Sequence, residues 1–221
     1  FGLEGLGQIS FSTIGGVIAD RLNRRVVLVV VQISRALIYL ALALLVIFES
    51  VELWHLLIIG LSQGVLLAAI LPSSDALIYD TVGPKRLLNA VAFTNGAFSL
   101  SSIFSFILAG FLISAVGIGP TFLVISGVLV LSPLPILRIR TSHSASSMES
   151  SFWRNLADGV KYSAESSPIR SLLIFSLLME LFGFSYHIML PVIARDVLKV
   201  GATGLGFLAA AGSFGEVLAN L

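Results

Sequence analysis

The sequence predicts an all-α fold, a bundle of helices that crosses a membrane several times. Apolar residues make up 57 % of the chain and charged residues only 11 %, whereas a soluble domain carries about 25 % charge. The apolar residues form long runs, and short polar segments rich in lysine and arginine separate these runs. So much apolar surface has to face lipid.

The first three apolar runs occupy residues 5–19, 26–48 and 53–79. A helix needs about 20 residues to cross the hydrocarbon core of a bilayer. An acidic turn with Glu49 and Glu52 separates the second run from the third. We therefore expect one helix in each run.

The segment between Arg86 and Arg138 contains no charged residue. It is too long for a single crossing, and Gly117-Ile-Gly-Pro120 supplies a turn near its middle. We therefore predict two further spans, 88–116 and 121–137.

A polar connection follows the fifth span. Residues 138–151 are rich in serine, which predicts a flexible linker. Residues 152–165 carry apolar side chains at every fourth position and charge pairs at (i, i+4), which predicts an amphipathic surface helix. A sixth apolar run then covers 171–191, and a seventh begins near Thr203.

These segments predict three parts: an N-terminal helical half (1–137), a cytoplasmic linker with its amphipathic helix (138–168), and the start of a C-terminal half (169–221). Glycines and leucines of 5–22 recur in 204–221 at one constant offset. Transporters are often built from duplicated halves, and the linker lies between the two copies.

Basic residues predict the orientation. Ten lysines and arginines lie on one side of the predicted spans, and only Arg195 and Lys199 lie on the other. Loops with excess lysine and arginine stay in the cytoplasm. We therefore expect a multi-pass protein of the cell membrane with these ten residues on the cytoplasmic side: Arg21, Arg24, Arg25, Lys85, Arg86, Arg138, Arg140, Arg154, Lys161 and Arg170.

The first cytoplasmic turn carries a motif, Gly16-Val-Ile-Ala-Asp20-Arg21-Leu-Asn23-Arg24-Arg25. It resembles the signature G-x-x-x-D-R-x-G-R-R of the major facilitator superfamily, which lies between the second and third helices of that fold. Asn23 stands where glycine is usual. We expect it to keep a turn with positive φ, because asparagine tolerates that region better than most residues.

Gly16 lets another helix approach closely. Asp20 ends its own helix, where the dipole disfavours an anion, so it needs a positive partner. The resemblance implies a cytoplasmic gating motif in which Asp20 latches the two halves together. The alternative is that Arg21, Arg24 and Arg25 only hold the loop in the cytoplasm.

The resemblance covers the whole chain, from the second into the eighth of twelve helices, so we expect a fragment with about seven. Asn89-Ala90 and Leu190-Pro191 through Gly206 resemble the branch of siderophore, macrolide and drug exporters. Gln63-Gly64 fits the fourth-helix pattern R-x-x-Q-G, with Gly60 in place of arginine. The resemblance implies a secondary active exporter of a small amphipathic solute, working by alternating access, with proton coupling as one option.

Four charged residues lie within predicted spans: Arg35, Asp75, Glu180 and Glu216. A charge at the bilayer centre costs about 2.5–3.5 kcal/mol, so it is rarely idle. Our hypothesis places Arg35 and Glu180 at a central polar cavity, with Glu180 as the protonation site. The alternative for each is a structural ion pair or a side chain that reaches interfacial water.

No catalytic, cofactor or metal site is predicted. Residues 60–64 match the G-x-S-x-G nucleophile pattern, but they lie inside an apolar run, so we interpret Gly60 and Gly64 as helix-packing positions. The three histidines lack metal-ligand spacing. We therefore do not expect an enzyme.

The expected partners are the lipid bilayer, a small-molecule solute and, if transport is coupled, protons. A net charge of +1 argues against nucleic acid, and we expect a monomer. Three alternatives to an exporter stay open: an importer of a small metabolite, a receptor or scaffold that does not transport, and an integral-membrane enzyme.

Overall fold

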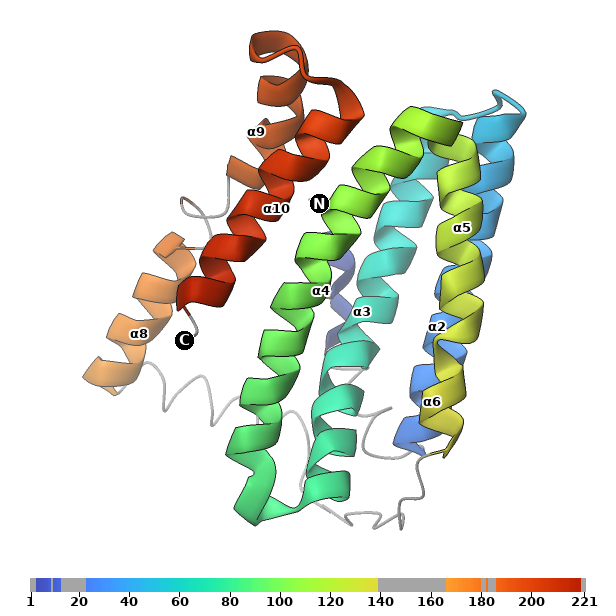
Figure 1. The fold of residues 1–221 in the computed structure, drawn as a ribbon. Coiled ribbons are helices and arrows are strands. Elements are labelled where there is room, and N and C mark those ends of the chain that lie inside the picture. Colours follow the sequence, from blue (N-terminus) through green and yellow to red (C-terminus); the bar gives the residue numbers. More distant parts are fainter. Residues whose placement is uncertain are drawn as a thin grey trace.

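The computed structural model describes residues 3–8, 10–12, 23–138, 166–179, 182 and 186–219, and every regular element among them is a helix (Figure 1). This confirms the all-α prediction. The predicted linker after Arg138 and the amphipathic helix lie outside the described residues. The named elements are α2 (Arg24–Ile47), α3 (Leu53–Val82), the 3-10 turn η1 (Pro84–Arg86), α4 (Leu87–Val116), α5 (Ile118–Leu131), α6 (Pro133–Arg138), α8 (Ser167–Leu178), α9 (Tyr186–Val192), the π-helical turn η3 (Ile193–Val197) and α10 (Gly201–Ala219).

Within the described ranges, four helical segments are long and apolar enough to cross a membrane: Arg24–Ile47, Leu53–Val82, Pro84–Val116 and Ile118–Arg138. They match the second to fifth predicted runs, and their most apolar windows have a mean hydropathy of 2.0 to 2.2. Only 11 % to 33 % of each window is buried within the described fold. The remaining apolar surface is therefore available to lipid or to further helices.

The turn between α4 and α5 is shorter than predicted. Gly117 alone connects the two helices, with a φ of 88° that favours glycine. Helix α5 begins at Ile118 instead of Thr121, and Pro120 lies in its first turn. Proline is tolerated there because the first amides of a helix have no partner within the helix.

Asn23 does not adopt the positive φ that we predicted. Its φ is −62° and its ψ is 110°, the extended conformation of a residue that caps a helix N-terminus. Its side-chain oxygen accepts a hydrogen bond from the backbone amide of Arg25 at 3.1 Å. Asparagine replaces glycine here as the N-cap of α2, a role for which it is among the preferred residues.

Helix α2 packs between α3 and α5, and small side chains lie where these helices meet. Val27 and Val31 of α2 form a buried cluster with Ala69 of α3. The buried hydroxyl of Ser126 in α5 donates to the carbonyl of Ala36 in α2 at 2.8 Å. Close packing and interhelical hydrogen bonds of this kind hold helices together where lipid removes the hydrophobic driving force.

Helix α10 leans against α4 (Figure 1), and their closest approach is at Gly110 and Gly206. A Cβ atom on Gly110 would lie 2.7 Å from the carbonyl oxygen of Ala202, and one on Gly206 would lie 2.6 Å from that of Phe106. The two backbones are in direct contact. This crossing joins the helices before the predicted linker to those after it.

The sixth and seventh spans differ from the prediction at their ends. Helix α8 begins at Ser167 instead of Ser171, and α10 begins at Gly201 instead of Thr203. Pro191, where we ended the sixth span, lies inside α9, and η3 extends the helical path to Val197. One proline removes one amide donor and bends a helix without necessarily ending it.

Candidate functional site

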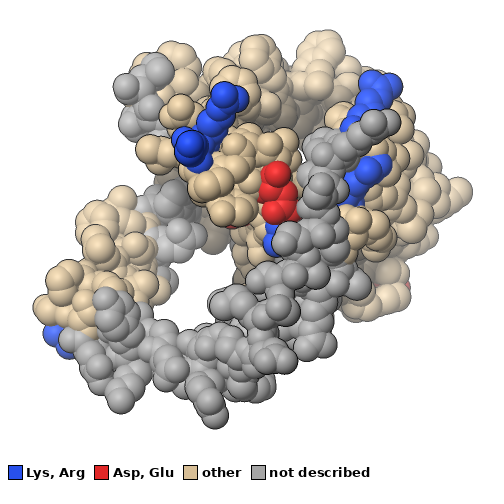
Figure 2. Space-filling view, turned by 90° about the horizontal axis from the view of Figure 1, so that it is seen from below, with Lys and Arg blue, Asp and Glu red and all other residues tan. Residues whose placement is uncertain are grey.

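Basic side chains gather at one end of the bundle. Helix α2 begins there, α3 ends, η1 connects α3 to α4, and α6 ends (lower side of Figure 1). Figure 2 shows this face, with lysines and arginines spread across it and few carboxylates. Its location on the cytoplasmic side stays a prediction. The basic residues that these elements contribute are Arg24, Arg25, Lys85, Arg86 and Arg138.

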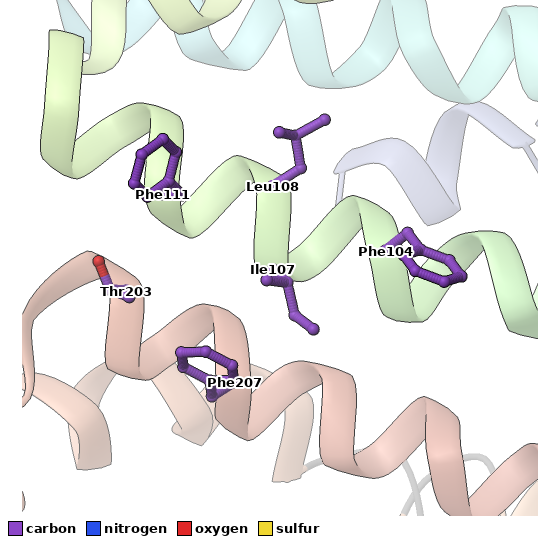
Figure 3. A pocket seen from close by; sticks show the side chains of 6 residues that line it. All are labelled: Phe104, Ile107, Leu108, Phe111, Thr203 and Phe207. Carbon is purple, nitrogen blue, oxygen red and sulfur yellow. The ribbon is translucent and has the colours of Figure 1, made fainter.

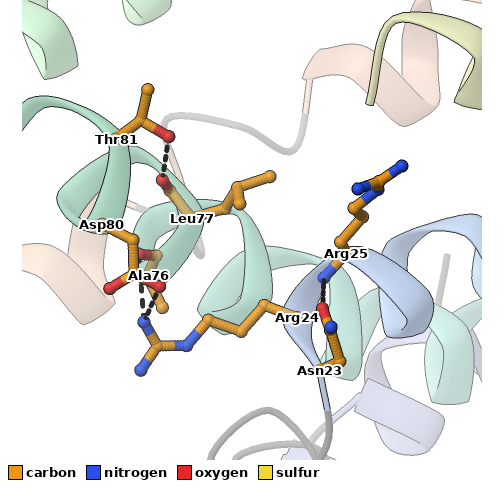
Figure 4. Close-up of polar contacts among 7 residues, drawn as sticks. All are labelled: Asn23, Arg24, Arg25, Ala76, Leu77, Asp80 and Thr81. Atoms are coloured by element: carbon orange, nitrogen blue, oxygen red, sulfur yellow. Dashed lines mark hydrogen bonds and ion pairs between the residues drawn. The ribbon is translucent and has the colours of Figure 1, made fainter. Parts of the chain in front are cut away.

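Arg24 joins α2 to α3 at this end (Figure 4). Its Nη1 pairs with the Oδ2 of Asp80 and donates to the carbonyl oxygen of Ala76 at 3.3 Å. The two charged side chains are 17 % and 18 % exposed. Because α2 and α3 run antiparallel, a cation at the start of α2 meets the carbonyl end of α3, where the helix dipole favours it.

Arg25 points away from Arg24 (Figure 4) and contacts a different helix. Its Nη2 donates to the carbonyl oxygen of Leu137 in α6. Arg24 and Arg25 are the two motif arginines that the structure describes. They fix the start of α2 to α3 on one side and to α6 on the other. Gly16, Asp20 and Arg21 lie outside the described residues, so the Asp20 latch stays a prediction.

Arg35 lies midway along α2, about 17 Å from either end at 1.5 Å per residue. An arginine side chain cannot span that distance, so it cannot reach interfacial water along its own helix. Its Nε donates to the Oε1 of Gln63 in α3 at 3.2 Å. Among the described residues, this is the hydrogen bond that Arg35 makes, and no carboxylate pairs with it.

The side-chain amides of Gln63 and Gln32 each have one buried atom without a hydrogen-bond partner in the described structure. The Nε2 of Gln63 and the Oε1 of Gln32, three residues before Arg35 on α2, are buried and make no hydrogen bond within the described structure. Buried polar atoms are almost always paired in native proteins. We call Gln32, Arg35 and Gln63 the midspan polar cluster.

The structure does not bring the other predicted charges to this cluster. Asp75 lies exposed on α3, and no described residue pairs with it. Glu180 lies outside the described residues. Glu216 belongs to α10, but its side chain is outside the described part. The hypothesis that Arg35 and Glu180 face one central cavity therefore stays a prediction.

A pocket of about 390 Å³ lies between α4 and α10 (Figure 3). Its lining is almost entirely apolar and aromatic, which suits a small amphipathic molecule. Near it, the hydroxyl of Thr203 donates to that of Ser114 at 3.0 Å. The residues that line the pocket are Phe104, Ile107, Leu108, Phe111, Thr203 and Phe207.

The two predicted packing glycines of α3 differ in their surroundings. Gly64 is buried against the helical turn at residues 3–8, where a Cβ atom would collide with the carbonyl of Glu4 and lie 2.9 Å from the amide of Gln8. At Gly60 the nearest neighbour, the Cβ atom of Leu3, would be 3.8 Å away, an ordinary contact. Close approach supports a packing role for Gly64 more strongly than for Gly60.

Sequence reasoning did not identify Asp80 and Gln32. Asp80 directly follows the third predicted apolar run (53–79), and it lies in the last turn of α3, where the helix dipole disfavours an anion without a cationic partner. That signal could have identified it. Gln32 carries no charge, so nothing in its local sequence distinguishes it from a lipid-facing glutamine.

Comparison with known proteins gives one family. The sequence profile of a family described as transmembrane secretion effector matches residues 5–221, almost the entire chain. No curated protein matches the chain.

Proposed function

Because the chain belongs to the transmembrane secretion effector family of the major facilitator superfamily, we propose that it acts in a secondary active exporter of small amphipathic solutes. The family and the four long apolar helices make it a multi-pass membrane transport protein. Export, the solute and the energy source are parts of the proposal. The resemblance to exporters in 89–90 and 190–206 supports the outward direction.

The observation that carries the proposal is the midspan polar cluster. A charged group held midway along an apolar helix is costly, and it is rarely found without a role on a substrate or ion pathway. The apolar pocket between α4 and α10 could receive the hydrophobic part of a solute. A polar group at depth and an apolar surface are both needed for an amphipathic solute, and the described structure supplies the first on α2 and α3 and the second on α4 and α10.

We also propose how the carrier works. The two helical halves rock about a site near the middle of the membrane, the Asp20 latch favours one of the two states, and Glu180 carries the coupling proton. The carrier lies in the cell membrane as a monomer, with its basic end in the cytoplasm. The latch, the proton and the orientation each rest on the sequence.

Membrane vesicles test the proposal. The protein is expressed from its complete reading frame, and inverted vesicles are given a panel of fluorescent dyes, macrolides and iron chelators with and without a proton gradient. We expect at least one solute to accumulate in the inverted vesicles, since their lumen corresponds to the cell exterior. Accumulation should stop when a protonophore collapses the gradient.

The same assay separates the alternatives. Accumulation only in right-side-out vesicles would show an importer of a small metabolite. Folded protein that binds solutes but moves none in either orientation would show a receptor or scaffold. Chemical conversion of a solute would show an integral-membrane enzyme.

A further inference from the structure

We propose that the midspan polar cluster binds a carboxylate group, so that the transported solutes are amphipathic monoanions. The inference rests on the proposed transport function and names its substrate class. It is drawn from the donors and acceptors that the cluster leaves unused.

Arg35 brings one positive charge to the middle of α2, and no described carboxylate neutralises it. Its one described hydrogen bond goes to the neutral Oε1 of Gln63. Arg35 is partly buried, and an arginine held midway along an apolar helix for structural reasons alone would be expected to have an acidic partner.

A guanidinium group has five N–H donors, and the bond to Gln63 uses only the one on Nε. The buried Nε2 of Gln63 is a further donor without a partner. The Oε1 of Gln63 accepts from Nε and so restrains the guanidinium, and no described residue bonds to its two terminal nitrogens. The unused groups are mainly donors, so the ligand has to be an acceptor.

A carboxylate has two oxygens in one plane and matches the paired terminal nitrogens of arginine. It also carries one negative charge, which balances the one charge of Arg35. A phosphate dianion would leave a second charge uncompensated in a medium of low dielectric constant. The depth of Arg35 places the site far from lipid headgroups, so a soluble solute is the source.

The experiment uses protein expressed from its complete reading frame, purified in detergent at neutral pH. The probes are decanoate, 2-naphthoate and indole-3-acetate, each compared with its own primary amide, which keeps the shape and removes the charge. Binding is measured from the concentration dependence of the melting temperature. We expect each carboxylate to half-saturate at a concentration about tenfold to a hundredfold below its amide, the usual gain for a hydrogen bond to a charged group.

Variants locate the site. Arg35→Gln should reduce the preference for carboxylate to within about twofold, and Arg35→Lys should keep part of it, because charge remains but the planar fork is lost. Gln63→Leu should weaken it. Arg195→Gln, which alters an exposed residue at the other end of the bundle, should leave it unchanged. The wild-type comparison of carboxylate with amide stands even if a variant does not fold.

Three results would overturn the inference. The first is equal binding of amides and carboxylates, and the second is a carboxylate preference that survives Arg35→Gln. The third is recovery of the preference when Glu180→Gln is added to Arg35→Gln, which would indicate an ion pair between Arg35 and Glu180. The proposed function can fail separately. Transport of neutral or cationic solutes with no carboxylate preference removes the inference and keeps the transporter. Carboxylate binding without movement of any solute would remove the proposed transport function and keep the carboxylate site.

Discussion

Arg24 and Asp80 each lie at the unfavourable end of their own helix. A cation at the start of α2 and an anion in the last turn of α3 oppose the respective helix dipoles. The antiparallel packing brings them together, and each charge then also lies near the favourable end of the other helix. Both charges are less than one-fifth exposed, so the pair should contribute more than a surface ion pair does.

We therefore expect Arg24→Gln and Asp80→Asn each to lower the free energy of unfolding by about 1–3 kcal/mol, because each leaves the other charge without its partner. The double variant should be less destabilised than the sum of the two, with a coupling of about 0.5–3 kcal/mol. Equilibrium unfolding in detergent measures all four proteins.

The matched control is Arg195→Gln. Arg195 pairs with its neighbour Asp196 at 3.4 Å, but the two side chains are 88 % and 61 % exposed. Solvent screens such a pair, and the change should stay within about 0.5 kcal/mol. Additive effects in the Arg24 and Asp80 variants would show that the contact does not stabilise the start of α2.

Glu180 is the residue on which proton coupling depends in our proposal. A carboxylate that exchanges the coupling proton gives transport a pH dependence, and glutamine removes the exchange while keeping the size of the side chain. We expect Glu180→Gln to abolish acceleration by a proton gradient and to flatten the pH profile of solute accumulation in inverted vesicles. An unchanged profile in a transporting variant would remove Glu180 from the mechanism.

At the scale of elements, glycine decides where α4 and α10 meet. Gly96 and Gly110 lie on the same helix, but only Gly110 faces another backbone. No described atom would lie within 4 Å of a Cβ atom on Gly96, so the same substitution should have different effects at the two positions. This provides a pair in which helix propensity is held constant and packing varies.

We expect Gly110→Ala to destabilise the protein by about 1–3 kcal/mol, because the new methyl group would lie 2.7 Å from the carbonyl oxygen of Ala202 and would push α10 away. Gly96→Ala should be neutral or stabilise by up to about 1 kcal/mol through its gain in helix propensity. Thermal unfolding of the two purified variants measures the difference. Equal effects would mean that α10 does not rest on Gly110.

Local sequence was sufficient to predict which segments form long apolar helices, but it was insufficient to predict the residues at which these helices begin and end. The existence of α2, α3, α4 and α5 follows from the length of the apolar runs, which is a property of consecutive residues. Helix ends depend on single backbone angles. We expected positive φ at Asn23 and a four-residue turn after α4, whereas Asn23 caps α2 in an extended conformation and Gly117 alone makes the turn.

The site was predictable only in part, for a related reason. Arg35 stands out because a charge is rare at that depth. Its partner Gln63 is 28 residues away, and their contact depends on how α2 and α3 are rotated about their axes, which the apolar pattern of these helices leaves undetermined. The same limit hid the pairing of Arg24 with Asp80, 56 residues apart.

At the scale of the whole molecule, the described bundle consists of two groups of helices that touch along one seam. The contacts between α4 and α10 involve Phe106 to Ser114 on one side and Ala202 to Gly206 on the other. Below this seam the two helices diverge toward the basic end (Figure 1). The seam is therefore closed at the end away from the basic residues. If the halves alternate in the way we propose, this seam has to open during each cycle.

A reversible crosslink tests that requirement. The hydroxyls of Ser114 and Thr203 are 3.0 Å apart, close enough for cysteines at these positions to form a disulfide, and residues 1–221 contain no other cysteine to interfere. We expect the double variant Ser114→Cys, Thr203→Cys to crosslink under mild oxidation. Vesicle transport should then fall below about a tenth of its initial rate, since a disulfide does not open on the timescale of a transport cycle, and should recover after reduction. Each single variant should transport normally in both conditions. Full transport by the crosslinked protein would mean that α4 and α10 stay together throughout the cycle.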